Sequence, residues 1–365
     1  PTQIWCVGVH CDDGDFMFRS PDEFHTFLDA RRGYRVVGHN AVGYDFPVLA
    51  RLWGVDWSHF NLYDTMVLSR LASPSREGGH SLASWGERLG YPKGDHDDWT
   101  QLSQDMLDYC ARDVEVTVAT LRAVERELAG FDEKSIELEH EVAHIIEQQR
   151  ANGWLLDQEK CFLLLARLKE KKFELESEVH ERFVPYPERS GSYSGKITGS
   201  GEFTLVGLRG VPLAVVAGPF THIDFPEFNL GSRQQIGEYL IRFGWKPKDF
   251  TPTGQPKVDE TVLEAVEGIP EATLIAEYLT VQKRIAMVQS WLEAVEDDGR
   301  VHGYVNSNGA VTGRMTHNSP NVAQVPASYS PYGHECREVW TVPEGMALVG
   351  CDADGLELRM LAHYM

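Results

Sequence analysis

The most informative stretch of this chain is Asp352-Ala-Asp-Gly-Leu-Glu-Leu-Arg-Met-Leu-Ala-His-Tyr-Met365. It follows a run of apolar and small residues, Met346–Cys351, whose composition is typical of a buried β-strand. We therefore expect Asp352 at the end of a strand, with Glu357 and Arg359 on the helix that follows. An acidic residue at a strand end, beside small residues, can hold a metal ion where a triphosphate reaches it.

A longer motif lies upstream, at Asn308-Gly-Ala-Val-Thr-Gly-Arg-Met-Thr-His-Asn-Ser-Pro-Asn-Val-Ala-Gln-Val-Pro326. Arg314, Asn321 and Gln324 are hydrogen-bond donors that suit the minor groove of DNA, where acceptors occur in every base pair. A protein that checks duplex geometry without reading sequence needs such contacts; a plain loop with one arginine is the simpler alternative. Arg337 is a further candidate for a DNA phosphate contact, with a surface ion pair as its alternative.

Two shorter motifs lie in the first third of the chain. The stretch His39-Asn-Ala-Val-Gly-Tyr-Asp-Phe-Pro-Val-Leu49 places Asp45 at the start of a helix, and Tyr109-Cys-Ala-Arg-Asp113 places a tyrosine and an aspartate one helical turn apart. Two carboxylates from separate elements can hold a divalent metal, and a nearby tyrosine can orient water for phosphodiester hydrolysis. The simpler interpretation of Asp64 is a turn or helix cap, and that of His80 is a local hydrogen-bonding residue.

Together these motifs resemble those of family A DNA polymerases, closest to the podophage-type replicative enzymes. The N-terminal pair is similar to the second and third motifs of the DEDD 3′→5′ exonucleases, in their tyrosine variety. The resemblance implies template-directed DNA synthesis from dNTPs on primer-template DNA, with proofreading, for phage genome replication. It also implies two Mg²⁺ ions per active site, with Mn²⁺ as a substitute.

The same resemblance assigns roles to individual residues. Glu357 would exclude ribonucleotides, and Tyr109 would orient the attacking water of the exonuclease. The implied catalytic residues are Asp352, Glu357, Tyr109, Asp45 and Asp113; the implied metal ligands are Asp352, Ala353 (through its carbonyl), Asp45 and Asp113; and the implied DNA-binding residues are Arg314, Asn321, Gln324 and Arg337.

Parts of the family pattern are missing from the sequence. No Asp-x-Glu pair precedes Asp45 in this sequence, and the second catalytic aspartate and the nucleotide-binding Lys/Tyr helix, which come later in the family, are not among its residues. We therefore expect a polymerase truncated at both ends, with poor metal affinity at Asp45 and Asp113. Two alternatives stay open. One is a catalytically inactive DNA-binding fragment, and the other is a bacterial repair polymerase of the same family, which the sequence of residues Gly355–Arg359 disfavours.

The expected fold class is α/β, because strands and helices alternate through residues 1–130. We expect an RNase H-like exonuclease domain at 1–130 without its first motif, a mainly helical thumb at 131–300, and the start of an α+β palm at 301–365 that ends within the Asp352 motif. Two helices should fill Glu133–Phe183, with Asp157 capping the second, and a further helix should start at Ser232.

The stretch 185–226 is rich in Gly and Ser and is expected to form a β-ribbon or a loop, with β-like runs at Phe203–Val206 and Val211–Val216. By resemblance it lies at the tip of the thumb, where podophage polymerases capture host thioredoxin as a processivity factor. This insertion is shorter and less basic, so a thumb tip without a partner is the alternative.

Composition sets further bounds. The net charge of −21 argues against binding through one large basic patch, although Arg300, Arg314 and Arg337 outnumber the acids of residues 300–340 and could line a groove. The 6 cysteines are scattered, which is typical of reduced, mostly buried thiols. No segment approaches membrane-spanning length and the N-terminus is unlike a signal peptide, so we expect a protein of the cytoplasm, that of the host if viral.

Overall fold

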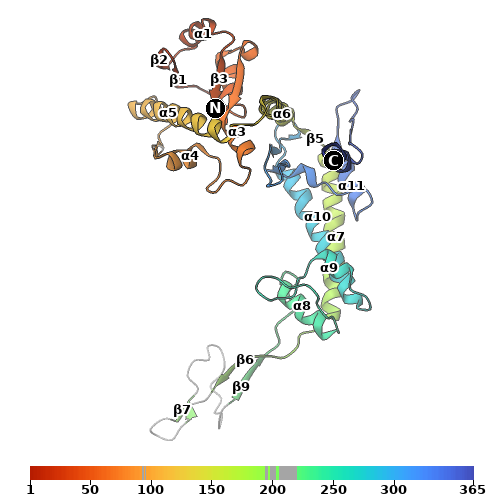
Figure 1. Cartoon of the computed structure of the whole chain (residues 1–365). Helices are drawn as coiled ribbons and strands as arrows, with labels where there is room; N and C mark the ends of the chain where they lie inside the picture. The colour runs from red at the N-terminus through yellow and green to blue at the C-terminus, as the bar shows by residue number, and fades with distance from the viewer. Residues whose placement is uncertain (93, 95, 194–195, 198–202, 205–219) are drawn as a thin grey trace. The chain divides into compact units, whose positions relative to one another are not determined.

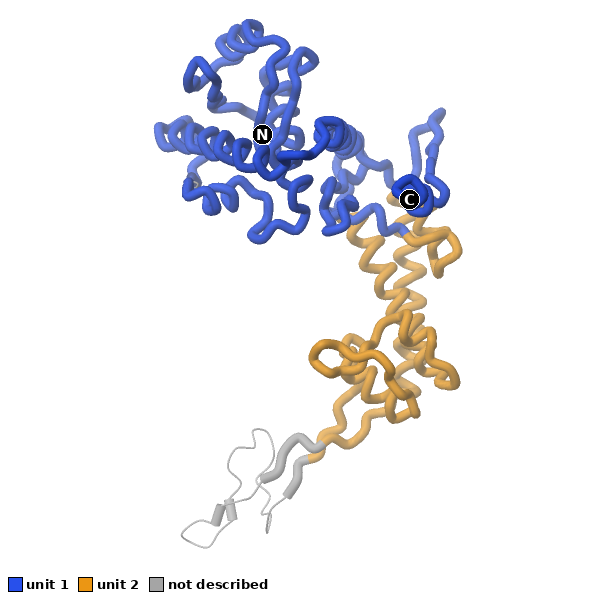
Figure 2. Tube along the Cα trace, viewed as in Figure 1, with its two compact units in different colours: residues 1–156, 294–325, 340–365 blue, residues 157–293, 326–339 orange. Residues whose placement is uncertain are grey.

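The computed structural model describes residues 1–92, 94, 96–193, 196–197, 203–204 and 220–365 of the chain. These residues divide into two compact units (Figures 1 and 2). Unit 1 comprises residues 1–156, 294–325 and 340–365, and unit 2 comprises residues 157–293 and 326–339. Residues 131–156 of the expected thumb thus belong to unit 1, and residues 326–339 of the expected palm belong to unit 2; the division into three domains stays a prediction.

Unit 1 begins with two small sheets. Strands β1 (Val7–Cys11) and β2 (Gly14–Phe18) form an antiparallel hairpin, and helix α1 (Pro21–Asp29) starts after the side-chain cap of Ser20. Strand β3 (Arg35–Gly38) pairs in parallel with β4 (Asn61–Asp64). Parallel pairing requires a crossover, and here the connection contains α2 (Asp45–Trp53) and a short 3₁₀ turn, η1 (Trp57–His59).

Three helices pack around these strands: α3 (Thr65–Ala72), α4 (Leu82–Leu89) and α5 (Gln104–Glu127). Helix α5 packs against α3, α4 and β1 and buries Val116 and Val124 completely. Trp85 of α4 and Leu68 of α3 join Val124 in one apolar cluster. The expected mixture of strands and helices in residues 1–130 is confirmed, whereas the RNase H-like arrangement stays a prediction.

The rest of unit 1 is built from segments that lie far apart in the sequence. Helix α6 (Glu133–Asn152) leads to β5 (Trp154–Leu156), the central strand of an antiparallel sheet with the order β10-β5-β13. The remaining elements are β10 (Arg300–Val301), β11 (Tyr304–Asn306), β12 (Thr316–Asn318), η2 (Val322–Gln324), β13 (Trp340–Thr341) and α12 (Leu356–Tyr364). Residues 302–303 separate β10 from β11, and the two strands join different sheets.

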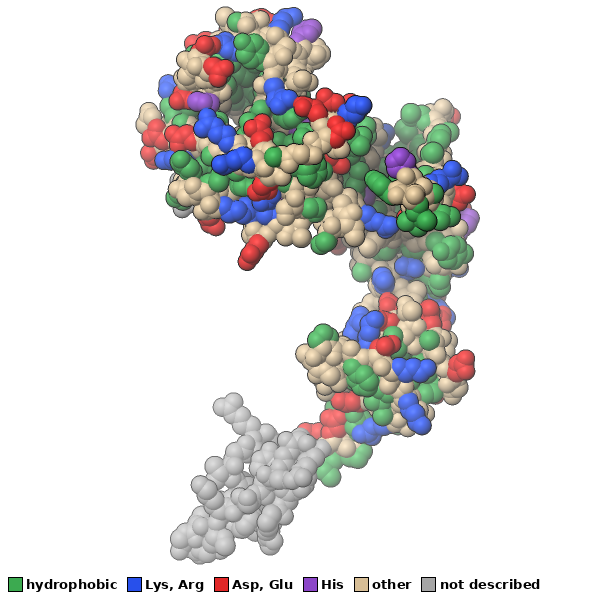
Figure 3. Space-filling model, in the orientation of Figure 1, with side chains coloured by type: hydrophobic (Ala, Val, Ile, Leu, Met, Phe, Trp, Pro, Cys, Tyr) green, Lys and Arg blue, Asp and Glu red, His purple; other side chains and the backbone are tan. Residues whose placement is uncertain are grey.

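The strand expected at Met346–Cys351 is absent from the structure, and this prediction is wrong. A strand needs a neighbour to satisfy its backbone N–H and C=O groups, and no strand of the described residues pairs with this segment. Its side chains are exposed, Leu348 by 61% and Val349 by 86%, and hydrophobic atoms gather at the surface there (Figure 3). The helix expected after Asp352 is confirmed as α12.

Unit 2 is mainly helical, as expected. Helix α7 (Gln158–Arg182) packs along α10 (Pro270–Glu293), and buried apolar residues line both. The predicted caps are confirmed, since Asp157 accepts the N–H of Lys160 and Ser232 accepts that of Gln235. The other elements are β6 (Glu188–Tyr193), β7 (Lys196–Ile197), β8 (Phe203–Thr204), β9 (Phe220–Asp224), α8 (Arg233–Arg242), α9 (Glu260–Glu264) and α11 (Gly333–Glu338).

The insertion contains an antiparallel β-ribbon, because β6 pairs with β9 and β7 with β8. Of the two expected β-like runs, the first begins with β8, and residues 211–216 lie outside the described part. Within the described ranges, no helix is long and apolar enough to cross a membrane.

The expectation that the cysteines are mostly buried is wrong. Only Cys161 and Cys336 are buried, Cys6, Cys11 and Cys110 are half-buried, and Cys351 is exposed. The half-buried Cys6, Cys11 and Cys110 lie where β1 borders solvent or α5, so packing shields them incompletely. All six are free thiols, as expected.

Candidate active sites

Asp45 lies at the N-terminus of α2, directly after the turn that leaves β3. Asp45 is an exposed residue, yet protein atoms crowd its carboxyl group. This desolvation, together with repulsion from the carboxylates of Asp64 and then Asp113, raises the pKa of Asp45 to about 6. The structure therefore brings the two predicted exonuclease acids, Asp45 and Asp113, into one electrostatic neighbourhood, and adds Asp64 to it.

Asp64 holds the turn that carries Asp45. Its carboxylate accepts the backbone N–H groups of Asn40 at 2.8 Å, Val42 at 3.0 Å and Met66 at 2.8 Å. The Met66 bond caps α3, which confirms the expected helix-cap role. The other two bonds fix the turn between β3 and α2, so Asp64 sets the position from which the Asp45 side chain leaves the backbone.

Helix α6 holds the same turn from another side. The ring of His140, which is 4% exposed, accepts the N–H of Asp64 at 2.9 Å through Nε2, and its Nδ1–H donates to the carbonyl of Ile136 at 2.8 Å. Arg150 donates to the carbonyl of Gly43 at 2.9 Å. Asp64 therefore receives support from residues that are distant in sequence.

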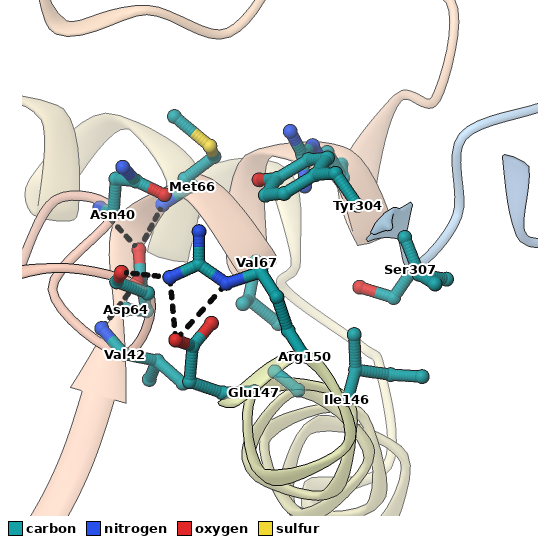
Figure 4. A pocket seen from close by; sticks show the side chains of 14 residues that line it. Asn40, Val42, Asp64, Met66, Val67, Ile146, Glu147, Arg150, Tyr304 and Ser307 are labelled. Atoms are coloured by element: carbon teal, nitrogen blue, oxygen red, sulfur yellow. Dashed lines mark hydrogen bonds and ion pairs between the residues drawn. The ribbon is translucent and has the colours of Figure 1, made fainter. Parts of the chain in front are cut away.

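These contacts border a pocket within unit 1 that both polar and apolar side chains line (Figure 4). Asn40, Asp64 and Met66 lie on one side of it, and Arg150 pairs with Glu147 of the same helix at 2.5 Å. Tyr304 and Ser307, at and just after β11, complete the lining, and the guanidinium of Arg150 lies 5.8 Å from the centre of the Tyr304 ring. The pocket thus joins the turn before Asp45 to the segment that leads into the Asn308–Pro326 motif.

Tyr109 and Asp113 both lie on α5, one helical turn apart. The Tyr109 ring makes an edge contact with Trp99, with centroids 5.6 Å apart, and lies 5.9 Å from the His96 ring. These contacts hold the tyrosine against the segment that precedes α5. His80, expected to be structural, bonds with Ser69 at 2.8 Å and Pro74 at 3.3 Å, which confirms that interpretation.

The predicted DNA-binding residues occupy several elements. Arg314 lies in the loop between β11 and β12 and is exposed, whereas Asn321 caps η2 through a bond from the N–H of Ala323. Gln324 ends η2 and is exposed. Arg337, in unit 2, donates from Nε to the carbonyl of Pro326 at 2.7 Å, which anchors its guanidinium at one edge.

The C-terminal candidates lie in an open segment. Asp352 and Ala353 are exposed, and Glu357 on α12 pairs with Arg314 at 3.2 Å. Arg359 donates from Nε to the carbonyl of Asp354 at 2.9 Å, which ties the first turn of α12 to the residues before it. Because both partners of the Glu357–Arg314 pair are exposed, the contact is weak.

Mg²⁺ prefers oxygen ligands and is commonly held by one or two carboxylates together with substrate phosphates. Asp45 and Asp113 fit such a partial shell, since desolvation and, to a smaller extent, the charges of Asp64 and Asp113 raise the pKa of Asp45, and a bound cation would offset both effects. At the C-terminal segment, one carboxylate and one carbonyl do not amount to a two-metal site. Among the described residues, no three His, Cys, Asp or Glu side chains gather as a metal site would require.

Comparisons with known proteins identify the family. The model of DNA polymerase family A matches residues 217–365. A DNA-directed DNA polymerase of Enterobacteria phage T3 is 31% identical over 100% of this chain and 67% of its own length. This chain belongs to DNA polymerase family A. A DNA-directed DNA polymerase of Escherichia phage T7 is 30% identical over the same shares, which makes the chain a family A polymerase of the phage type.

A solved polymerase structure shares the fold of this chain. The POL domain of Pol1 from M. smegmatis, solved in complex with DNA primer-template and dNTP, has a TM-score of 0.65 and 17% sequence identity. The likeness covers 94% of this family A chain and 55% of the mycobacterial one. The family A chain therefore spans about two thirds of its phage relatives and about half of this structure.

Sequence reasoning missed the residues that support the Asp45 turn. His140 and Arg150 contact it across 76 and 107 residues of chain. A histidine and an arginine on a long helix carry no signal for such contacts. The pattern around Asp64 indicated a cap, and it gave no sign that this carboxylate also fixes the preceding turn.

Proposed function

We propose that this chain takes part in template-directed DNA synthesis from dNTPs for phage genome replication, and that its first portion is a 3′→5′ proofreading exonuclease. The similarity to phage DNA polymerases along 100% of the chain supports the first part. The raised pKa of Asp45, caused first by desolvation and then by the charges of Asp64 and Asp113, carries the second. Perturbed carboxylates of this kind gather at functional sites.

In the exonuclease, Asp45 and Asp113 would hold Mg²⁺ or Mn²⁺ against the scissile phosphate. The bound metal would neutralise phosphate charge and favour ionisation of the attacking water. Tyr109, one turn before Asp113 and braced by Trp99, would orient that water. Asp64 accepts three backbone N–H groups and acts as a positioning residue for Asp45.

In the polymerase, Arg314, Asn321 and Gln324 would donate hydrogen bonds to minor-groove acceptors of the primer-template, and Arg337 would contact a phosphate. Asp352 and the Ala353 carbonyl would contribute to the metal site, and Glu357 would exclude ribonucleotides. These residues would thus position the duplex, contribute ligands to the metal site and select the sugar. Capture of a thioredoxin-like processivity factor by residues 185–226 is a weaker proposal, supported by the ribbon formed by β6 and β9.

The test is a labelled primer-template incubated with the chain and Mg²⁺, with and without dNTPs, and resolved by length. We expect primer shortening without dNTPs, and its loss in Asp113→Asn. The matched control is Asp105→Asn, another acid of α5 that is exposed and lies outside the cluster. Equal shortening by Asp113→Asn, or DNA binding without any shortening by the unaltered chain, would overturn the exonuclease proposal.

A further inference from the structure

Two cysteine side chains meet where the start of the chain packs on α5. Cys6 directly precedes β1, Cys110 lies in α5, and their thiols are within hydrogen-bonding contact. Both residues are half-buried, so small solutes can reach them. The contact joins positions 104 residues apart, and it does not involve the Asp352 segment or the primer-template motif.

The backbone geometry explains why the two sulfurs meet. Residues two apart in an extended chain face the same side, so Cys6 and Gly8 point the same way. A Cβ placed on Gly8 would lie 3.1 Å from Sγ of Cys110 and 3.0 Å from a methyl group of Val114. The glycine therefore lets α5 approach the strand closely, and Cys6 lies over the adjacent part of the same helix.

A second cysteine pair provides an internal comparison. Cys161 and Cys336 are both 0% exposed, and burial raises the pKa of the first to about 12 and of the second to about 11. Thiols that stay protonated and shielded react slowly. At Cys6 the hydrogen bond from Cys110 outweighs desolvation and, helped by the charge of Arg19, lowers the pKa to about 7. The same hydrogen bond raises the pKa of Cys110, so Cys6 is the thiol of this pair that ionises and reacts first.

We propose that Cys6 and Cys110 form an oxidative modification site, where a peroxide converts the two thiols into a disulfide that joins the start of β1 to α5. The Cys6 thiolate attacks one peroxide oxygen, the O–O bond breaks, and hydroxide leaves, giving a sulfenic acid. The Cys110 sulfur then attacks the Cys6 sulfur, the S–O bond breaks, and water leaves with the thiol proton. Both sulfurs are oxidised, the peroxide is reduced to two waters, and a dithiol reductant reverses the change.

The modification lies beside the proposed exonuclease residues without depending on them. Cys110 follows Tyr109 directly and precedes Asp113 by one turn of α5. A covalent bond from β1 to this point would fix the helix face that carries both residues. The chemical test below is independent of nuclease activity, so it stands or falls separately from the function proposed above.

The experiment maps the disulfide by mass spectrometry. A full chain with Cys351→Ser, which removes the exposed thiol that would cross-link chains, is treated with hydrogen peroxide, alkylated in denaturant and digested with trypsin without reduction. Cys6 and Cys11 fall in the peptide of residues 1–19, and Cys110 falls in that of residues 94–112. We expect these peptides joined with the loss of two hydrogens, and released by dithiothreitol.

Matched variants assign the bond. It should persist in Cys11→Ser and disappear in Cys6→Ser, while Cys161 and Cys336 are recovered as alkylated thiols in every sample. The oxidised chain should also melt at a higher temperature than the reduced one, since a cross-link restricts the unfolded state; Cys6→Ser should show no such shift. Absence of the joined peptide, or its loss in Cys11→Ser alone, would overturn the proposal.

Discussion

The two candidate active sites of unit 1 differ in how their acids are held. Asp64 is 2% exposed, and its carboxylate accepts three backbone N–H groups and fixes the turn that carries Asp45. Asp352 lies in an exposed segment whose apolar neighbours, such as Val349, face solvent. One site is organised by hydrogen bonds and packing among the described residues. The other has its sequence motif without a sheet to hold it.

The difference shows what a motif needs before it becomes a site. A helix satisfies most of its backbone N–H and C=O groups through its own local hydrogen bonds, so α12 is present although no side chain caps its N-terminus and its surroundings are open. A strand end has no position until a neighbouring strand pairs with it. The carboxylates of Asp64 and Asp113 therefore add to the desolvation that raises the pKa of Asp45, whereas no hydrogen bond or ion pair from the described residues fixes the Asp352 side chain.

The largest difference in stability between the two sites is expected from Asp64→Ala. It leaves the N–H groups of Asn40, Val42 and Met66 without their acceptor, which should lower the free energy of unfolding by ~3 kcal/mol. Asp352→Ala should change it by less than ~0.5 kcal/mol, because the residue is exposed. Urea denaturation followed by tryptophan fluorescence measures both. Equal losses of stability in the two variants would show that Asp64 is held no more firmly than Asp352.

The second effect concerns His140, whose pKa is lowered chiefly by desolvation. Below about pH 6.5 the unfolded chain takes up a proton that the folded chain excludes, so stability falls as the pH falls, by up to ~1.4 kcal/mol per pH unit. The variant His140→Gln keeps an acceptor for the N–H of Asp64 and does not titrate. The stability of this variant relative to the unaltered chain should therefore increase as the pH is lowered from 7.5 to 5.5. A constant difference would show that His140 does not support the site through its neutral ring.

Much of the secondary structure followed from local chemistry. The caps at Asp157 and Ser232 and the break between α6 and α7 were predictable, because each depends on neighbours within a few residues. The absence of a strand at Met346–Cys351 was not predictable from the composition of this segment, since pairing with a neighbouring strand decides whether a strand forms. In the first site, Asp45 and Asp113 were predicted as a pair, whereas His140 entered only through a contact 76 residues away.

The third prediction tests the repulsion at Asp45 itself. Its pKa is raised to about 6 in the folded chain, so its ionisation costs stability as the pH rises from about 4 through 6. Asp45→Asn should therefore stabilise the chain at pH 7, by ~0.5–1 kcal/mol after allowance for the exposure of the residue. The gain should vanish near pH 4, where the carboxyl is protonated. Mg²⁺ should stabilise the unaltered chain more than the variant.

The control for this prediction is Asp105→Asn, since Asp105 also lies in the first turn of a helix. It loses only the favourable interaction of a negative charge with the helix N-terminus, so a small destabilisation of ~0.3 kcal/mol is expected. Thermal unfolding at pH 4 and pH 7 separates the two cases. If Asp45→Asn destabilises the chain at pH 7 as its control does, then the carboxylates of the first site do not repel each other as inferred.

The smallest effect on stability is expected at the open site. Arg314 and Glu357 pair at 3.2 Å, with side chains 74% and 81% exposed, so Arg314→Ala should leave the free energy of unfolding within ~0.5 kcal/mol. Affinity for a labelled primer-template should nevertheless fall several-fold in fluorescence anisotropy, because a donor to the minor groove is lost. Arg32→Ala, which also removes an exposed arginine from an ion pair on the surface of unit 1, is the matched control and should bind normally. Unchanged affinity in Arg314→Ala would mean that this segment, unlike the turn at Asp45, places no functional side chain by itself.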